Sequence, residues 1–336
     1  MENLLDVRGL KTSFNTKFGE VQAVRGVSFQ LTKGEVVGVV GESGCGKSIT
    51  MMSIMRLLDK NGIIKDGRIF FEGKDISKIT EKEMSKIRGN DIAMIFQDPM
   101  TSLNPLITIG NQIIEPLIIH EKLSKKEAFK KGVELLRLVN IPNPEKRMKQ
   151  YPHEFSGGMR QRAMIAMALS CNPKLIIADE PTTALDVTIQ AQIVEIMKNI
   201  KNKLGTSIIF ITHDLGVVAD ICDRVNVMYG GLIIEKGGIN DIFDNPKHPY
   251  TWGLLDSVPS VQKERKRLKP IEGQPPNLLK PPKGCPFYAR CKFAMNICRE
   301  KMPEFYEVSK KHKVSCWLSD EKAPKVIRAR SREVGL

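Results

Sequence analysis

The chain has 336 residues, of which 41% are hydrophobic and 27% charged, and its formal net charge is +14. This length accommodates one large α/β domain with an extension or two ordinary domains, and the hydrophobic fraction predicts a folded core rather than disorder. The opening MENLLDVRGL carries charges and no apolar stretch, and no segment approaches the roughly 18 apolar residues of a membrane span. We therefore expect no secretory signal and no transmembrane helix, so that any role at a membrane is peripheral.

The stretch EVVGVVGESGCGKSITMMSIMRLL, which begins at Glu35, predicts a buried strand, a glycine loop and a helix. GESGCGKS matches the G-x-x-x-x-G-K-[ST] phosphate-binding loop, and the flanking strand and helix argue against a chance glycine-rich turn. We expect Lys47 to reach the β- and γ-phosphates and Ser48 to ligate Mg²⁺, while the helix N-terminus adds its partial positive charge. The predicted nucleotide-binding residues here are Gly41, Glu42, Ser43, Gly44, Cys45, Gly46, Lys47, Ser48 and Ile49.

The segment from Asp98 to Met148 has few strand signals and a helical spacing of apolar residues. We expect it to be helical, with Pro105 and Pro116 breaking it into short helices.

A second anion site is indicated by HEFSGGMRQRAMIAMAL, which begins at His153. The Ser156 hydroxyl and the backbone N–H groups of the two following glycines, at the start of an apolar helix, can cradle an anion.

Two further apolar runs predict buried strands that end in polar residues. PKLIIADE ends in Asp179, which can hold the water shell of Mg²⁺, and in Glu180, which can orient or deprotonate an attacking water. SIIFITHD places His213 at the carboxyl end of its strand, where α/β sheets bind ligands. His213 is therefore a candidate γ-phosphate sensor, although a lone histidine is more often structural.

The SGGM stretch resembles the signature of the ATP-binding cassette (ABC) ATPases, which is usually written LSGGQ. Ser156, Gly157 and Gly158 match it, whereas Phe155 and Met159 depart from it. Met159 in place of glutamine removes one polar side-chain contact to the nucleotide. The resemblance implies an ATPase with an α/β fold of the P-loop type. Its expected parts are a RecA-like core, an antiparallel β subdomain and a helical subdomain at about residues 98–170.

The same resemblance assigns roles to residues outside these motifs. Gln97 in IFQDP looks like the Q-loop glutamine, which touches Mg²⁺ and links to the transporter's membrane part. Asp186 in TALD looks like the D-loop aspartate at a dimer seam, and Phe14 resembles the aromatic residue that stacks on adenine, with Phe18 as a rival. The implied Mg²⁺ ligands are Ser48, Gln97 and Asp179.

One chain carries a single phosphate loop and a single signature. In ABC ATPases each nucleotide is held between the loop of one subunit and the signature of the other. The resemblance therefore implies a dimer in which this signature acts in trans.

The remaining tail is basic and rich in cysteine, with 19 lysines and arginines against 8 acidic residues from Val261 to the C-terminus. KERKRLKP and QPPNLLKPPKG predict a linker, and so small a tail needs a staple. Four cysteines are the candidates, in the spacing C-x5-C-x6-C-x17-C, which lacks the usual zinc knuckle and suits an iron–sulfur cluster at least as well. They are Cys285, Cys291, Cys298 and Cys316, and His312 is a possible substitute ligand.

NPKHPYTWGLLDSVP and the cysteine-rich tail resemble the ATPase subunits of oligopeptide, dipeptide and nickel importers. This resemblance implies a cassette at 1–258 and an importer-type extension at 259–336 that holds a [4Fe–4S] cluster, with zinc as the alternative. It implies a second, related ABC ATPase as heterodimer partner, two integral membrane permease subunits and an extracellular or periplasmic solute-binding protein. The expected place is peripheral, on the cytoplasmic side of the cell membrane, with ATP and Mg²⁺ as cofactors and no nucleic acid as partner.

Two other functions remain open at this point. The basic tail also fits a cassette ATPase acting on nucleic acid, in repair or on ribosomes, for which salt-sensitive binding would be the mark. An exporter ATPase is the other, although the HPYTWGLL stretch favours import.

Overall fold

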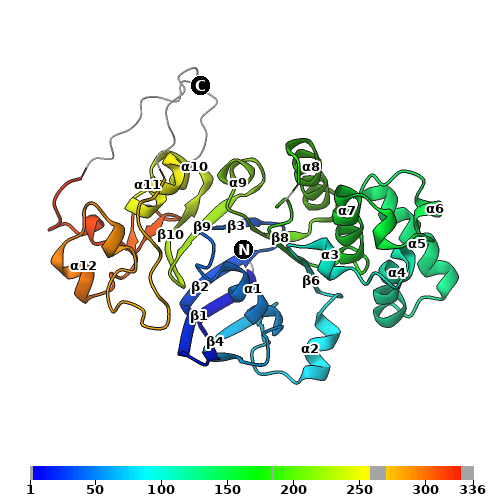
Figure 1. Cartoon of the computed structure of the whole chain (residues 1–336), viewed down its shortest axis with the longest axis horizontal. Coiled ribbons are helices and arrows are strands. Elements are labelled where there is room, and N and C mark those ends of the chain that lie inside the picture. Colours follow the sequence, from blue (N-terminus) through cyan, green and yellow to red (C-terminus); the bar gives the residue numbers. More distant parts are fainter. Residues whose placement is uncertain (1–2, 184, 258–269, 327–336) are drawn as a thin grey trace, which may run out of the picture.

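The computed structural model describes residues 3–183, 185–257 and 270–326. Its strands form a four-stranded sheet and an eight-stranded sheet. In Figure 1 the helices α4 to α7 gather at one end of the molecule, and the C-terminal segment with α12 lies at the opposite end. Among the described residues, none of the helices combines the length and the apolar character needed to cross a lipid bilayer.

The strands, in chain order, are β1 (Asn3–Thr16), β2 (Gly19–Thr32), β3 (Val36–Val40), β4 (Gly62–Phe71), β5 (Lys74–Asp75), β6 (Ile92–Ile95), β7 (Leu175–Asp179), β8 (Ser207–Ile211), β9 (Arg224–Tyr229), β10 (Leu232–Gly238), β11 (Tyr306–Glu307) and β12 (Lys313–Val314). The α-helices are α1 (Lys47–Met55), α2 (Glu81–Ile87), α3 (Pro99–Ser102), α4 (Ile109–His120), α5 (Lys125–Leu138), α6 (Pro144–Arg147), α7 (Gly157–Ala168), α8 (Val187–Leu204), α9 (Leu215–Ile221), α10 (Ile239–Asp244), α11 (Pro249–Asp256) and α12 (Asn296–Glu300). Short 3₁₀ turns span Pro152–Glu154, Tyr288–Arg290 and Trp317–Ser319.

The small sheet is antiparallel, in the order β2-β1-β4-β5. The large sheet has the order β11-β12-β10-β9-β3-β8-β7-β6 and is parallel from β9 to β6. Its central strands VVGVV, LIIAD and SIIFI are buried along their whole length, as expected for parallel strands covered on both faces. The α/β fold with an antiparallel subdomain agrees with the prediction from sequence.

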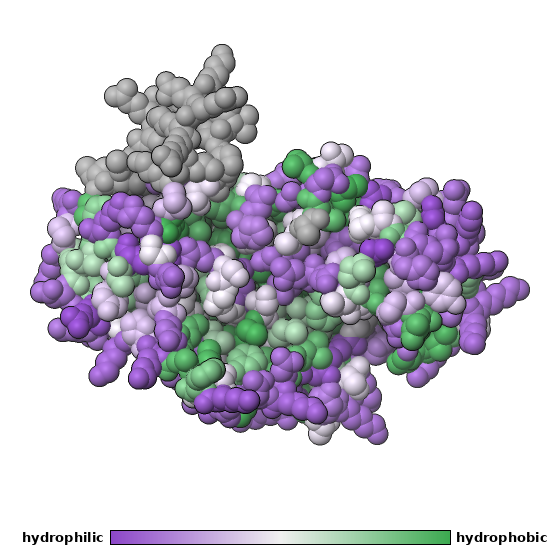
Figure 2. All heavy atoms as spheres, in the orientation of Figure 1, coloured by the Kyte–Doolittle hydropathy of each residue, from purple (hydrophilic) through white to green (hydrophobic). Residues whose placement is uncertain are grey.

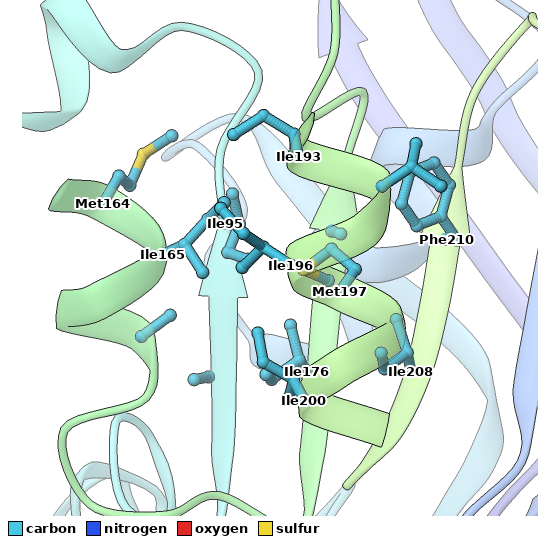
Figure 3. Close-up of a cluster of buried hydrophobic side chains, with 14 of the residues drawn as sticks. Ile95, Met164, Ile165, Ile176, Ile193, Ile196, Met197, Ile200, Ile208 and Phe210 are labelled. Carbon is cyan, nitrogen blue, oxygen red and sulfur yellow. The ribbon is translucent and has the colours of Figure 1, made fainter. Parts of the chain in front are cut away.

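Helix α8 covers one face of this parallel sheet. Figure 3 shows its apolar side chains pointing at the strands, where Ile196 and Ile200 lie over Ile176 of β7. Met164 and Ile165 of α7 approach from the neighbouring helix. All of these side chains are almost completely buried, so this layer contributes a large share of the hydrophobic stabilisation.

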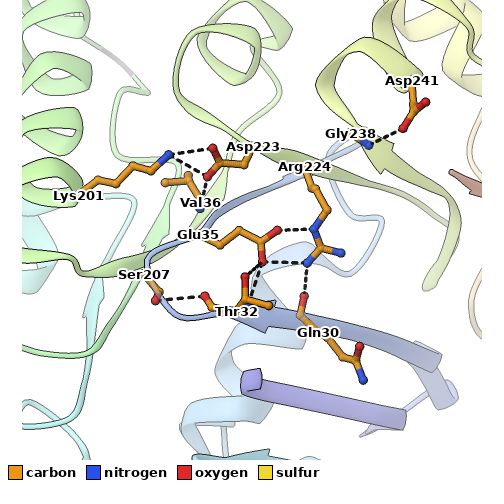
Figure 4. A network of polar contacts seen from close by, with 10 residues as sticks. All are labelled: Gln30, Thr32, Glu35, Val36, Lys201, Ser207, Asp223, Arg224, Gly238 and Asp241. Atoms are coloured by element: carbon orange, nitrogen blue, oxygen red, sulfur yellow. Dashed lines mark hydrogen bonds and ion pairs between the residues drawn. The ribbon is translucent and has the colours of Figure 1, made fainter. Parts of the chain in front are cut away.

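A polar network joins the two sheets where β2 turns into β3 (Figure 4). Glu35 receives hydrogen bonds from the Thr32 backbone and hydroxyl, both at 2.8 Å, and forms an ion pair with Arg224 of β9. Burial opposes ionisation of Glu35, but the Arg224 and Thr32 contacts outweigh it and lower the pKa of this carboxyl. Arg224 also donates to the Gln30 carbonyl oxygen at 2.8 Å, which ties β2 of the antiparallel sheet to β9, the neighbour of β3 in the large sheet.

The segment predicted to be helical, Asp98 to Met148, contains α3 to α6, and one expectation about it is wrong. Pro105 lies between α3 and α4 as expected, but Pro116 lies inside α4 and does not end it. Proline removes one backbone hydrogen bond from a helix interior, at a cost of about 3 kcal/mol. The helix continues because its buried face, with Ile113 and Leu117, packs against α5 and α7 and outweighs that cost.

The C-terminal segment continues the large sheet. Strand β12 pairs with β10, and β11 pairs with β12. The side chains of His312 and Glu235 are fully buried and lie 2.8 Å apart, beside this pairing. Phe287 and two of the tail cysteines belong to the same hydrophobic cluster as the parallel strands. The tail therefore shares its core with the rest of the chain, and most of the predicted linker KERKRLKP lies outside the described residues.

Candidate functional site

Two glycines of the loop after β3 are required by close backbone contacts as well as by their φ angles. Gly41 has a φ of +154°, and a Cβ atom there would lie 2.2 Å from the Met228 carbonyl oxygen. Gly46 has a φ of +101°, and its Cβ would lie 2.5 Å from the Ala23 carbonyl oxygen. Both contacts are with backbone, so neither can relax by a change of rotamer. The turn that follows places α1 with its first N–H groups at the loop.

Lys47 and Ser48 begin α1 and point back to the loop and the strand ends. The Lys47 Nζ is buried within the loop and donates to the carbonyl oxygens of Gly41 at 2.8 Å and Glu42 at 3.0 Å. The Ser48 hydroxyl donates to Asp179 Oδ1 at 2.9 Å. Burial raises the pKa of Asp179, while the hydrogen bond from Ser48 opposes that rise. The start of α1 and the end of β7 thus bring together the Lys47 ammonium group and two oxygen-bearing side chains, Ser48 and Asp179, which can ligate a metal ion.

Glu180 lies at the end of β7 and is surrounded by three side chains. Its Oε2 accepts hydrogen bonds from Gln97 Nε2 at 3.0 Å and from Thr183 Oγ1 at 2.8 Å, and His213 Nδ1 lies 3.5 Å away. Glu180 has a φ of +47°, which is uncommon for a residue with a side chain and is frequent at functional sites. Its N–H bonds the Ile211 carbonyl oxygen at the end of β8, so two strand ends fix this conformation.

The two candidates for adenine stacking differ in exposure. Phe14 is half-buried in β1, and its ring packs close to Gly62 of β4. Phe18 lies in the turn between β1 and β2 and is 88% exposed.

The signature stretch lies at the start of α7, apart from α1 in Figure 1. Phe155 is buried, whereas Ser156 and Gly157 are exposed. Ser156 caps the helix by accepting the Met159 N–H at 3.4 Å. A Cβ on Gly158 would lie 2.9 Å from Ile189 Cγ2 of α8, so this glycine lets the two helices approach, while at Gly157 nothing would meet it within 4 Å.

Asp186 is the N-cap of α8, and its Oδ1 accepts the Ile189 N–H at 2.9 Å. It is exposed on the same side of the chain as the α7 start, because Ile189 contacts Gly158. The first turns of α7 and α8 therefore form one open face.

The four tail cysteines line a common cavity beside the large sheet. The other lining residues that matter here are His248, Phe287 and Trp317. All four are free thiols, and burial raises the pKa of Cys285 and of Cys316 to about 12. Within the ranges that the structure describes, no group of three or more cysteine, histidine or acidic side chains is arranged to hold a metal ion. The cysteines share a cavity but do not form a coordination sphere.

His312, the predicted substitute ligand, is bound instead to Glu235 at 2.8 Å and does not line this cavity. His248 does line it. Its Nδ1 accepts the Tyr250 N–H at 3.0 Å, and its Nε2 lies 4.0 Å from the Cys285 sulfur. Burial lowers the pKa of His248 to about 4, so the ring is neutral.

Sequence reasoning missed several residues that touch the nucleotide loop and Glu180. Thr183 lies three residues after Glu180, at a spacing that could have drawn attention to it. Tyr250, whose hydroxyl accepts the Glu42 N–H at 2.7 Å, and Arg290, which pairs with Glu42, have no local signal. Their partner is more than 200 residues away in the chain.

Comparison with known proteins covers nearly the whole sequence. The pattern of the family described as "ABC transporter" matches residues 24–183, and that of "Oligopeptide/dipeptide transporter, C-terminal region" matches residues 234–298. The oligopeptide transport ATP-binding protein OppD of Bacillus subtilis is 57% identical, over 98% of this chain and 94% of its own length. The dipeptide transport ATP-binding protein DppD of the same organism is 56% identical, over 97% of this chain and 98% of its own length.

Among solved structures, the chain is similar to a dimeric post-hydrolysis state of the ATP-binding cassette MJ0796 bound to ADP and phosphate. The TM-score is 0.64 at 26% identity, over 70% of this chain and 98% of that one. CbiO1 from Clostridium perfringens, part of an ABC transporter complex, gives a TM-score of 0.62 at 29% identity, over 73% of this chain and 92% of its own. The curated relatives thus match the tail as well as the cassette, whereas the two solved structures cover 70% and 73% of the chain.

Proposed function

Since the chain belongs to the ABC transporter family, as an ATP-binding subunit of a dipeptide or oligopeptide importer, we propose that Glu180 drives its ATP hydrolysis. The observation that carries this proposal is the convergence of Gln97, Thr183 and His213 on one carboxylate, beside the Ser48–Asp179 pair. In-line attack on a γ-phosphate needs a positioned base and stabilisation of the phosphate charge. The chain supplies both at the ends of neighbouring parallel strands.

The phosphate loop and α1 bind the nucleotide through backbone N–H groups and Lys47. Lys47 now bonds the loop's own carbonyl oxygens, so its ammonium group must turn from them to the phosphate oxygens. The Ser48 hydroxyl, Asp179 and the Gln97 amide are hard oxygen donors that suit Mg²⁺, and a buried carboxylate of raised pKa gains from a cation. When bound, Mg²⁺ neutralises phosphate charge and orients the γ-phosphoryl group.

Glu180 takes the proton of the attacking water as the bond to the γ-phosphorus forms and the bond to the β-phosphate oxygen breaks. Thr183 and Gln97 hold its carboxylate in one orientation, and His213, which is largely exposed, is placed to contact the γ-phosphate. For adenine stacking, the exposed ring of Phe18 is favoured over Phe14, whose ring packs in the antiparallel sheet.

The signature acts on the nucleotide of a second subunit. This proposal is supported by the exposed cradle of Ser156 and Gly157 at the N-terminus of α7, which faces outward with Asp186. The partner is a second, related ABC ATPase, so that each composite site joins one phosphate loop to one signature. The cassette comprises residues 1–258, and residues 259–336 form the importer-type extension.

The helical subdomain is the surface that meets the two permease subunits, on the cytoplasmic side of the membrane. In Figure 2 this end of the molecule is largely hydrophilic and carries a small hydrophobic patch at its lower edge. The exposed apolar residues of the subdomain include Met100, Leu106 and Ile119. A solute-binding protein outside the cell delivers the peptide to the permeases. The curated relatives, which are peptide-transport ATPases, favour this role over the nucleic-acid and exporter alternatives.

The four-cysteine cavity is proposed to hold a [4Fe–4S] cluster. Its support is chemical: four cysteines face one buried space, and soft thiolates prefer iron–sulfur clusters or zinc to hard cations. The neutral thiols become thiolates only when a metal compensates their burial. When bound, the cluster would act as a structural staple between the segments that carry Cys285, Cys291, Cys298 and Cys316.

Metal content tests this cofactor. Purified without oxygen, the chain should contain about four iron and four sulfide per molecule, the composition of a cubane cluster. C285S should lose them, whereas C171S, at a buried cysteine outside the cavity, should keep them. If about one zinc per chain is found instead, the cavity binds zinc and not an iron–sulfur cluster. If neither metal is found, the proposal is contradicted.

Glu180→Gln tests the ATPase mechanism. Glutamine keeps an oxygen that accepts the Thr183 and Gln97 hydrogen bonds but cannot take a proton. The assembled importer with E180Q should bind ATP within about twofold of the wild-type affinity and hydrolyse it at least about a hundredfold more slowly. The matched control is E195Q, at an exposed carboxylate of α8, which should hydrolyse ATP normally. Normal turnover by E180Q would remove Glu180 from the catalytic role.

A further inference from the structure

The second residue of the phosphate loop, Glu42, is held from outside the loop by the C-terminal part of the chain. Its backbone N–H donates to the Tyr250 hydroxyl at 2.7 Å. Its carboxylate receives two hydrogen bonds from the Arg290 guanidinium, Nη1 to Oε2 at 2.6 Å and Nη2 to Oε1 at 3.0 Å. Both ends of one loop residue are therefore tied to positions that follow the cassette's last strands.

Arg290 is built into its position rather than lying on the surface. Its side chain is 5% exposed, and that of Glu42 is 25% exposed. The remaining guanidinium hydrogen bonds go to the carbonyl oxygens of Ile271 and Glu272 and to the Tyr229 hydroxyl, at 2.9, 2.8 and 3.1 Å. A planar guanidinium with a bidentate carboxylate and every nitrogen engaged has one orientation.

The same short segment forms the wall of the cysteine cavity. Arg290 ends the 3₁₀ turn Tyr288–Arg290 and directly precedes Cys291, and Phe287 lines the cavity from the other end of this turn. The Phe287 ring packs edge-on against Tyr229, at 5.3 Å, and against Tyr250, at 5.4 Å. The short segment from Cys285 to Cys291 thus carries two of the cavity's cysteines and also Arg290, which binds Glu42 of the phosphate loop.

We propose that Arg290 is a positioning residue for nucleotide binding, which neutralises Glu42 and so makes the shape of the phosphate loop depend on the C-terminal extension. Tyr250, near the end of the cassette, holds the backbone of the same loop residue. The proposal rests on the ATPase function given above. It adds that the tail of this chain acts on the nucleotide site of the same chain.

The direction of the effect follows from charge. Without Arg290, the Glu42 carboxylate remains as an uncompensated anion in a loop that must receive a polyphosphate, and like charges at close range repel. Removing that carboxylate as well relieves the repulsion. The defect of an Arg290 variant should therefore be suppressed by a change at Glu42, which a general loss of folding would not be.

The experiment measures ATP affinity and turnover for the full chain, assembled with its partners. R290M should weaken ATP binding about tenfold, the effect of losing a charged hydrogen-bonded pair. The double variant R290M/E42Q should regain most of the ATP affinity that R290M loses. The turnover at saturating ATP should change less than the affinity, because the groups around Glu180 are untouched. K292M, at an exposed lysine two residues away, is the matched control and should behave as the wild type.

Y250F provides an independent test that keeps the buried ring and removes only the hydroxyl acceptor of the Glu42 N–H. It should weaken ATP binding by about threefold to tenfold. Iron or zinc content and the thermal midpoint are measured for every variant, so that loss of the extension itself is recognised.

Each outcome is decisive. If the wild type fails to bind ATP, the proposed ATPase function fails before Arg290 is tested. If R290M binds ATP normally, or if its defect persists in R290M/E42Q, Arg290 does not act through Glu42 and the proposal is overturned. A tenfold loss that E42Q suppresses supports it, and R290K, which keeps the charge without the fork, should then fall between R290M and the wild type.

Discussion

At the level of single residues, two glycines of the phosphate loop have positive φ angles but different surroundings. Gly44 has a φ of +75°, and a Cβ atom there would meet nothing within 4 Å. Gly46 has a φ of +101°, and its Cβ would run into the Ala23 carbonyl oxygen of β2. At Gly44 only the backbone conformation favours glycine. At Gly46 a side chain is excluded by the close contact as well.

Alanine at the two positions should therefore have unequal effects. G44A forces a left-handed conformation at a cost of about 1–2 kcal/mol and should weaken ATP binding by up to about thirtyfold. G46A must also displace the backbone of β2, so it should abolish measurable ATP binding and lower the thermal midpoint. ATP titration and circular dichroism melting check both variants. Equal losses in the two would show that the contact with Ala23 is unimportant.

The phosphate loop, the Asp179–Glu180 pair and His213 come together in the structure because each follows or ends a strand of the parallel sheet. Ser48 and Asp179 are far apart in the chain, yet parallel pairing of β3, β8 and β7 brings their motifs to one edge of the sheet. Arg290 and Tyr250 could not be found in this way. Their role comes from where the tail folds back, which no short-range pattern encodes.

At the level of elements, the strands were easier to predict than the helices and the tail. Runs such as VVGVV and SIIFI are apolar at every position, and they are strands buried on both faces. Pro116 misled because its local preference was overridden by the apolar packing of α4. Strands β11 and β12 span two residues each and have no periodicity to read. The buried His312–Glu235 contact that accompanies them joins residues that are distant in sequence.

At the level of the whole molecule, the exposed start of α7 is the surface at which the proposed trans role of the signature can be tested. A side chain at Gly157 has open space around it, whereas one at Gly158 would meet Ile189. The described residues therefore give no steric reason for glycine at 157, which supports the proposed contact with a second subunit.

G157D should consequently leave the isolated chain intact and damage only the assembled one. On the single chain, its thermal midpoint should be unchanged, and its ATP affinity should match that of the wild type within about twofold. In the complex with the partner ATPase and permeases, hydrolysis should fall at least about tenfold, because a carboxylate in the cradle repels the γ-phosphate. G158A is the contrasting variant and should destabilise the single chain through the α7–α8 contact. Weakened ATP binding by isolated G157D, or full hydrolysis by the complex, would contradict the trans role.

The pairing of β10 with β12 also affects the tendency of the protein to aggregate through the edge of its large sheet. A strand at the rim of a sheet presents unpaired N–H and C=O groups to any other chain, and very short rim strands give little for a stray strand to join. Here the seven-residue β10 is covered along part of its length by the two-residue β12, followed by the two-residue β11. A cassette truncated before the tail would therefore expose the unpaired backbone groups at the outer edge of β10. We expect such a truncated chain to self-associate by pairing of these edges.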